Sequence, residues 1–203
     1  MNEILPGVHH WTARHPKIKI EVSSYYLSGE KTLIDPLVPA EGLDWFAGGV
    51  EHIYLTNRHH YRQSGDFQRR FGCDIWCAEE GLHEFKHGEK VRPFRFGDKL
   101  PGGVEAVEIG SLCSDETALL IPKGAGLVAL ADGVVREGDG PLGFVLDEYM
   151  GDDPEADKAG LREAYRRLLR RSFDTLLLAH GWPIVGTGKK ALEEFITAKE
   201  MGP

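Results

Sequence analysis

The stretch VEHIYLTNRHHYRQSGDFQRRFGCDIWCAEEG, residues 50–81, decides the fold of this chain. It opens with an apolar run at residues 50–55 that is typical of a strand buried on both faces. A polar cluster follows, then a short helix predicted at residues 67–71 and a second strand predicted at residues 73–77. A strand, a polar loop, a helix and a strand form a βαβ unit. Such units place reactive side chains in the loop at the carboxyl end of the first strand.

The polar cluster TNRHHYR, residues 56–62, resembles the Thr-His-x-His-x-Asp-His motif of the metallo-β-lactamase superfamily, in its thioesterase-like branch with glyoxalase II. In that family the motif supplies four metal ligands. This sequence keeps only the second histidine, as His59, and has Asn57, Tyr61 and Arg62 in the other three places. The resemblance therefore predicts the family fold with an altered metal site.

Three later positions resemble the remaining ligands of the family. The segment GSLCSDETAL, residues 110–119, resembles a motif that carries the third histidine, and it offers Leu112 or, in a second alignment, Ser111. Asp132, after an apolar strand, resembles the aspartate that bridges two metals; an aspartate before glycine is equally typical of a turn. His180 resembles the final histidine ligand.

The resemblance spans about residues 4–196 and implies an α+β fold, a four-layer αββα sandwich of two mixed sheets flanked by helices. We expect one domain over residues 1–203. Asp35 resembles a family residue that hydrogen-bonds backbone beneath the metal loop. Further strands are predicted at residues 4–11, 17–27, 31–37, 92–96, 104–109, 118–122, 127–131 and 173–181. Further helices are predicted at residues 42–49, 81–88 and 189–199, and from residue 152 through a buried stripe at residues 161–169.

The composition limits the partners. The chain has 203 residues, 41% of them apolar, and a formal net charge of -8, so it lacks the overall basic character that nucleic acids or anionic membranes attract. It contains no run of 18 apolar residues, and its N-terminus lacks the features of a signal peptide. These features predict a cytoplasmic protein with no nucleic-acid or membrane partner, and they leave a homodimer open.

Three other patterns have structural and functional interpretations. Cys73 and Cys77 lie on one face of a predicted strand, which favours small core residues over a metal or disulfide site. His83 and His87 have the i, i+4 spacing that could clamp a metal, although a solvated helix face is the more common case. The arginine-rich helix face at residues 162–171 is typical of a solvated surface with a Glu163 to Arg167 pair, and an acidic partner is the alternative.

The substituted ligands argue against the two-metal site of the family. The first metal of the family is bound by three imidazoles, and the corresponding residues here are Asn57, His59 and Leu112. At an effective dielectric constant of 20, a unit charge at 4 Å repels another by about 4 kcal/mol, so Arg62 would repel a divalent ion by roughly 8 kcal/mol. That repulsion approaches the apparent binding energy of a good zinc site, about 10–16 kcal/mol. We therefore predict that Arg62 replaces the second metal and pairs with Asp132.

Three functions are compatible with this sequence. The first is a protein without a cofactor that binds a small anionic ligand or is a pseudoenzyme. The second is a hydrolase of an ester or thioester with one zinc, iron or manganese ion held by His59, Asp132 and His180, with His60 or Tyr61 assisting as acid or base. The third is an interaction domain. The sequence assigns no catalytic residue, and the pocket candidates are Asn57, His59, His60, Tyr61, Arg62, Leu112, Asp132 and His180.

Overall fold

The larger of two sheets contains the first seven strands in sequence order. The computed structural model describes residues 1–198. Pairing is antiparallel from β1 to β4 and parallel from β4 to β7, so the sheet is mixed. Its strands are β1 (Asn2–Leu5), β2 (Val8–Arg14), β3 (Glu21–Leu27), β4 (Thr32–Ile34), β5 (His52–Tyr54), β6 (Asp74–Ala78) and β7 (Val91–Phe94).

The smaller sheet has the order β13-β10-β9-β8. It is also mixed, because β10 and β13 are parallel while the β10–β9 and β9–β8 pairs are antiparallel. Its strands are β8 (Glu105–Glu108), β9 (Thr117–Ile121), β10 (Leu127–Leu130) and β13 (Thr175–Leu178). A separate short ribbon pairs β11 (Val134–Val135) with β12 (Gly143–Phe144).

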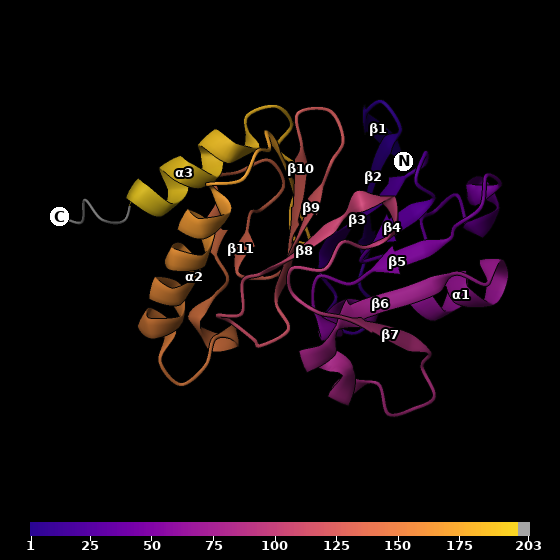
Figure 1. The fold of residues 1–203 in the computed structure, drawn as a ribbon, viewed down its shortest axis with the longest axis horizontal. Helices are drawn as coiled ribbons and strands as arrows, with labels where there is room; N and C mark the ends of the chain where they lie inside the picture. Colours follow the sequence, from indigo (N-terminus) through magenta and orange to yellow (C-terminus); the bar gives the residue numbers. More distant parts are fainter. Residues whose placement is uncertain (199–203) are drawn as a thin grey trace.

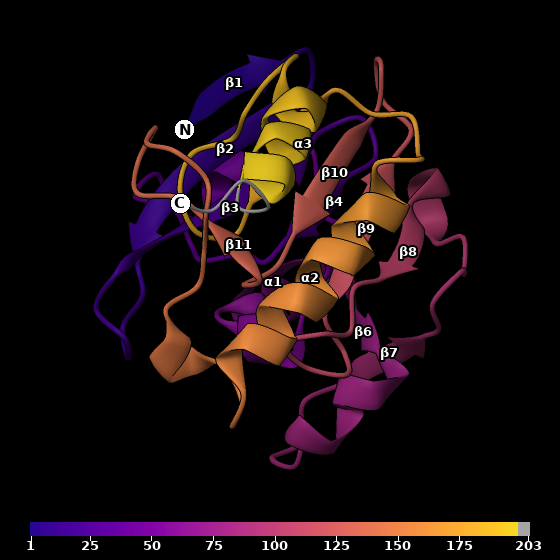
Figure 2. The same ribbon diagram turned by 90° about the vertical axis from the view of Figure 1, so that its left-hand side faces the viewer.

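Helices cover the outer faces of both sheets (Figure 1). The helix α1 (Ser64–Phe71) lies on the side of the larger sheet, and α2 (Pro154–Leu168) and α3 (Gly188–Ala198) lie on the side of the smaller one. Figure 2 shows α2 and α3 crossing in front of the smaller sheet. Short 3₁₀ helices are η1 (Leu43–Phe46), η2 (Arg58–Tyr61), η3 (Glu79–Glu84), η4 (Pro101–Gly103) and η5 (Asp147–Tyr149).

The strands bury both of their faces, which explains the layered arrangement. In β3, Tyr25 packs into the core between the two sheets, while its neighbour Tyr26 packs into the core beneath η1 and α1. In β10, Ala129 faces the core between the sheets, while Val128 faces the core that α2 and α3 cover. Because side chains alternate across a strand, a sheet covered on both faces needs apolar residues at successive positions. The predicted αββα sandwich is confirmed.

Several predicted elements differ in detail. Residues 4–11 form two strands rather than one, because a turn at Pro6 and Gly7 separates β1 from β2 and places Gly7 at a φ of 72°. The strand predicted at residues 17–27 begins only at Glu21. The two-residue strands β11 and β12 are too short for a period-2 pattern and were not predicted. The last position of the helix predicted at residues 189–199 lies outside the described residues.

The structure also shows the positions of the two cysteines, the two histidines and the Glu163–Arg167 pair that the sequence singled out. Cys73 and Cys77 are free, buried core residues beneath α1, as the sequence favoured. The helix predicted at residues 81–88 is instead the 3₁₀ helix η3, which ends before His87, so His83 and His87 do not share a helical face. Arg167 lies 3.7 Å from Glu163, which confirms that pair.

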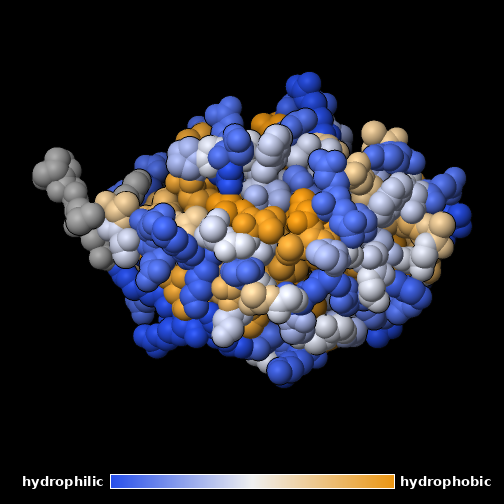
Figure 3. Space-filling view, turned by 90° about the horizontal axis from the view of Figure 1, so that it is seen from above, coloured by the Kyte–Doolittle hydropathy of each residue, from blue (hydrophilic) through white to orange (hydrophobic). Residues whose placement is uncertain are grey.

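Apolar side chains reach the surface in several places. Figure 3 shows a hydrophobic band across the middle of one face, with hydrophilic residues on both sides. Within residues 1–198, no helix is long and apolar enough to cross a membrane. The large exposed apolar residues are Ile18, Ile20, Trp45, Leu146, Tyr149, Trp182 and Val185.

Candidate functional site

Three side chains converge where the two sheets meet. Asp132 follows β10 and His180 follows β13, and because these strands are parallel neighbours their carboxyl ends lie together. His60 comes from η2, the turn after β5. The Nε2 atoms of His60 and His180 each lie 3.0 Å from Asp132 Oδ1. One donor atom from each of the three residues lies within 4.8 Å of the other two.

The two oxygens of Asp132 have different surroundings. Oδ2 accepts a hydrogen bond of 2.8 Å from the Asn57 amide. Oδ1 is buried and has two imidazole nitrogens at 3.0 Å. Burial alone would raise the pKa of this carboxyl, but the charge of His60 and contacts with His180 hold the pKa well below its usual range. Asp132 is therefore an ionised, half-buried group whose Oδ1 faces both imidazoles.

His60 is held between two carboxylates. Its Nδ1 lies 3.0 Å from Asp35 Oδ2 and 2.9 Å from Thr56 Oγ1, which leaves Nε2 to face Asp132. Asp35 also accepts the Thr56 backbone N–H and its hydroxyl, at 2.9 and 2.6 Å. Burial would lower the pKa of His60, but Asp132 and Asp35 raise it to about 9. Asp35 has the structural role beneath the loop that the sequence predicted, and it also orients His60.

The predicted ion pair between Arg62 and Asp132 is wrong. Arg62 Nη1 instead donates to the backbone carbonyls of Ser23 and Asp35, both at 2.6 Å, and Nη2 has a long contact of 3.5 Å with the carbonyl of Ala179. Asp132 is already surrounded by Asn57 and the two imidazoles, so it offers the guanidinium no free side. Arg62 has a φ of 44°, a strained conformation for a residue other than glycine.

Of the two adjacent histidines in η2, His60 and not His59 lies at the candidate site. The structure places His60 in the group with Asp132 and His180, whereas His59 is exposed. The His59 backbone N–H donates to the side chain of Asn57, which caps η2. Successive residues of a 3₁₀ helix point about 120° apart, so only one of two adjacent histidines can face inward. The structure therefore groups His60, and not His59, with Asp132 and His180, so the predicted donor set differs at this one position.

Tyr61 and Leu112 lie outside this group. The ring of Tyr61 packs against Phe85, with a centroid separation of 5.7 Å. Leu112 contributes only its backbone N–H, which donates to Glu116 Oε2 at 3.2 Å. Ser111, from the second alignment, packs against the helix position of Gly160. The third histidine of the family thus has no replacement in the group.

The buried carboxyl of Glu116 had no predicted role. Its Oε1 accepts the backbone N–H of Gly133 at 2.8 Å, directly after Asp132, and its Oε2 accepts the N–H of Leu112. Burial raises the pKa of Glu116 to about 7. An acidic residue at the start of an apolar strand is the signal that could have identified it. Glu116 ties the Asp132 turn to the segment before β9.

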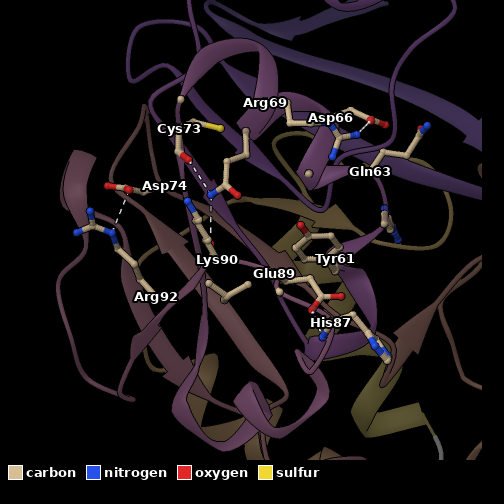
Figure 4. Close-up of a pocket in the computed structure, with 16 residues that line it drawn as sticks. Tyr61, Gln63, Asp66, Arg69, Cys73, Asp74, His87, Glu89, Lys90 and Arg92 are labelled. Carbon is tan, nitrogen blue, oxygen red and sulfur yellow. Dashed lines mark hydrogen bonds and ion pairs between the residues drawn. The ribbon is translucent and has the colours of Figure 1, made fainter.

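A wider groove lies elsewhere on the described residues. A groove of about 1030 Å³ lies between α1 and the loop before β7, and Tyr61 and His87 are among the residues that line it (Figure 4). Its charges largely neutralise one another. Arg69 pairs with Asp66, and Arg92 lies 3.0 Å from Asp74. This groove does not include Asp132 or His180.

Comparison with solved structures identifies the architecture. A metallo-β-lactamase family protein from Thermus thermophilus superimposes with a TM-score of 0.66 at 17% identity, over 98% of this chain and 81% of that one. A metallo-β-lactamase superfamily protein from Sulfolobus tokodaii gives a TM-score of 0.70 at 15% identity, over 97% and 87%. The protein has a metallo-β-lactamase fold. A further protein with this fold, TTHA1623, was solved in a di-iron-bound form and gives a TM-score of 0.64 at 19% identity, over 86% of this chain and 93% of that one.

These structural similarities show only the fold of the protein. No protein-family model matches the sequence, and no curated protein matches it. Structural similarity below 20% identity carries an architecture but not an activity. The function must therefore be argued from the side chains of the site.

Proposed function

We propose that this protein is a metallo-β-lactamase-fold hydrolase that binds one divalent metal ion at His60, Asp132 and His180. The observation that carries the proposal is the convergence of three donors, with the Nε2 atoms of His60 and His180 each 3.0 Å from Asp132 Oδ1. Two donors that bind one ion at about 2.1 Å and about 90° apart lie about 3.0 Å from each other. A separation of 3.0 Å is also that of an ordinary N–H···O hydrogen bond, so the proposal rests on the convergence of all three donors and not on the spacing alone.

The chemistry of the donors fits the same conclusion. Two imidazoles and one carboxylate with open positions suit zinc, iron or manganese. Metal-bound histidines usually donate their second ring nitrogen to a carboxylate, and Asp35 is placed to accept from Nδ1 of His60 in this way. When bound, such an ion generates hydroxide near neutral pH and polarises a substrate carbonyl.

The charges around the site favour one ion over two. The carboxylates of Asp35 and Asp132 face the guanidinium of Arg62 and the imidazole of His60. A divalent ion in place of the His60 proton would leave a net charge of about one positive unit, which a hydroxide or an anionic substrate neutralises. A second ion would meet Arg62 and Tyr61 in place of the family's aspartate and histidine, without ligands to offset the repulsion.

The remaining residues of the site act as positioning groups. The Asn57 amide holds Oδ2 of Asp132 and so directs Oδ1 toward the imidazoles. Glu116 holds the backbone after Asp132. An ester or thioester carbonyl is the substrate that this arrangement favours, because a single Lewis acid with a bound hydroxide suits acyl hydrolysis.

Element analysis of the purified protein after loading with zinc, iron or manganese tests the proposal. We expect one ion per chain, lost in His60→Ala and Asp132→Ala and retained in His59→Ala. The adjacent exposed histidine is a matched control because it removes the same side chain from the same turn. An ion that His59→Ala removes and His60→Ala leaves in place, or a protein that retains no metal, would refute the assignment.

A second candidate function is a protein without a metal that binds a small anion or acts as a pseudoenzyme. The observation that favours it is the pairing of His60 with both Asp35 and Asp132, which satisfies the carboxylates without an ion. Thermal unfolding separates the two functions, because a ligand that binds only the folded state raises the melting temperature. Stabilisation by phosphate and not by divalent metals would favour the second candidate.

A further inference from the structure

The loop between β2 and β3 is strongly basic in a chain that is otherwise acidic. Its sequence RHPKIK, residues 14–19, holds three cationic side chains and one histidine and no carboxylate, whereas the whole chain has a net charge of -8. The exposed cations are Arg14, Lys17 and Lys19. A local reversal of charge of this kind attracts anions to the surface where it lies.

Hydrogen bonds give this loop a defined shape. Arg14 Nε donates to the carbonyl of Lys19 at 3.0 Å, and the backbone of His15 exchanges bonds with Lys19 and Ile20 at 3.0 and 2.8 Å. The Nδ1 atom of His15 accepts the backbone N–H groups of residues 17 and 18, at 3.2 and 3.3 Å. Because Nδ1 is an acceptor, the neutral imidazole carries its proton on Nε2. His15 thus has a donor available for a ligand.

The loop borders a cavity. A space of about 450 Å³ is lined by Arg14, His15, Pro16 and Lys19. This volume falls within the range of small-ligand pockets, about 300–1,000 Å³. The cavity is therefore large enough for a carboxylate or phosphate group together with the part of a molecule that carries it.

The loop leads directly into β3, which borders the His60, Asp132 and His180 group. At the start of β3, Ser23 donates its backbone N–H to the carbonyl of Ala179 at 2.9 Å and its hydroxyl to the carbonyl of Gly181 at 2.7 Å, on either side of His180. Burial, and then the charges of Arg62, His60 and His180, lower the pKa of His15.

The cations of the loop have no carboxylate partners among the residues described. Glu21 lies opposite Arg14 in the register of β2 and β3 but forms no ion pair with it. Lys17 and Lys19 are likewise free of ion pairs within residues 1–198, whereas cations elsewhere, such as Lys123, have an acidic partner. An anion at the loop would meet charges that no internal carboxylate neutralises.

We propose that residues 14–19 form an anion-binding subsite for the substrate, which is an ester or thioester that carries a carboxylate or phosphate group. This inference rests on the proposed function for its acyl chemistry, but the subsite itself requires no metal. Arg14, Lys19 and His15 Nε2 bind the anionic group, and the reacting carbonyl extends toward His60, Asp132 and His180. The hollow at the loop is open to solvent, and Ile18 and Ile20 are also exposed there, so an anionic membrane surface is the alternative that the test must exclude.

The test measures binding of inorganic phosphate and of citrate to the purified full chain by calorimetry, with metals removed by chelation. A triple variant, R14S/K17S/K19S, is compared with R167S/R170S/K190S, which removes the same charge from exposed positions of α2, its C-terminal end and α3. We expect the loop variant to weaken binding at least about tenfold and the control to change it less than about twofold. Signals of His15 in the NMR spectrum should shift with phosphate.

The outcomes separate this inference from the proposed function. Phosphate binding that depends on the loop supports the subsite even where element analysis finds no metal. Equal weakening by both triple variants means that only net charge matters and overturns the proposal. Metal binding at His60 without phosphate or citrate binding also overturns it, and leaves the proposed function intact. Loop-dependent retention on vesicles of anionic phospholipid, with no binding of free phosphate, would show a membrane contact and refute the subsite.

Discussion

His60 Nδ1 lies 3.0 Å from Asp35 Oδ2, and this contact orients the imidazole whose other nitrogen faces Asp132. Both residues are buried, and Asp35 takes further hydrogen bonds from Thr56. The contact joins the end of β4 to the polar turn after β5. The whole site depends on it, because only a fixed His60 ring can present Nε2 toward Asp132.

Asp35→Asn should destabilise the protein by roughly 3 kcal/mol, because it removes one partner of a buried charged pair. Urea denaturation measures the change in the free energy of unfolding. Glu51→Gln is the control, since Glu51 and Lys31 form a pair of 2.8 Å that is exposed, and its loss should cost no more than about 1 kcal/mol. Equal effects of the two variants would contradict the role given to Asp35.

Arg62→Met should cost about 2–6 kcal/mol. The substitution leaves the carbonyls of Ser23 and Asp35 without their donor in a buried region, and each unsatisfied group costs about 1–3 kcal/mol. Arg70→Met makes the same chemical change at an exposed position, where a 3.4 Å contact with Asp44 and a cation–π contact with Phe71 are lost, and should cost about 1 kcal/mol. Chemical denaturation of both variants decides whether Arg62 stabilises the junction of these segments.

Glu116 predicts a dependence of stability on pH. Its pKa is raised from 4.5 in the unfolded chain to about 7 in the folded protein, so the folded state binds more protons between these values. Stability contributed by this group is therefore full below about pH 4.5 and is lost as the pH rises to about 7, by roughly 3 kcal/mol. The difference between the wild type and Glu116→Gln, measured in urea at pH 5 and pH 8, isolates this contribution. A constant difference between the two proteins would refute the shift.

Gly133→Ala should destabilise the turn that carries Asp132. A Cβ at this position would lie 2.5 Å from Leu161 Cδ2 and 2.6 Å from Glu116 Oε1, too close for either atom. We expect a cost of about 1–3 kcal/mol, as for other overpacked sites, and weaker metal binding. Gly143→Ala is the matched control, because a Cβ there has no neighbour within 4 Å. Unfolding curves of both variants provide the comparison.

The layers of the fold could be predicted because every buried strand has its own local signal. The segment Leu127–Leu130, for example, is apolar at each position, as a strand with cores on both faces requires. The turn between β1 and β2 was missed because Val8 continues the apolar pattern past Pro6 and Gly7. Only the paired geometry of the hairpin separates these strands.

The site was harder to predict. Asp132 and His180 were identified by their resemblance to ligand positions of the family, and the structure brings them together. The choice between His59 and His60 depends on where the 3₁₀ turn begins, which the Asn57 cap sets and the family motif does not encode. The partners of Arg62 are backbone carbonyls from distant segments. Every residue has a backbone carbonyl, so the sequence does not show which ones Arg62 will contact.

The most direct test of the site is a crystal structure of the protein grown with zinc or manganese, with anomalous scattering recorded at the absorption edge of the metal. The account predicts one ion per chain, about 2.0–2.2 Å from Nε2 of His60, Nε2 of His180 and Oδ1 of Asp132, with Arg62 still bound to backbone carbonyls. Two ions, or an ion bound by His59 with His60 turned away from Asp132, would contradict it.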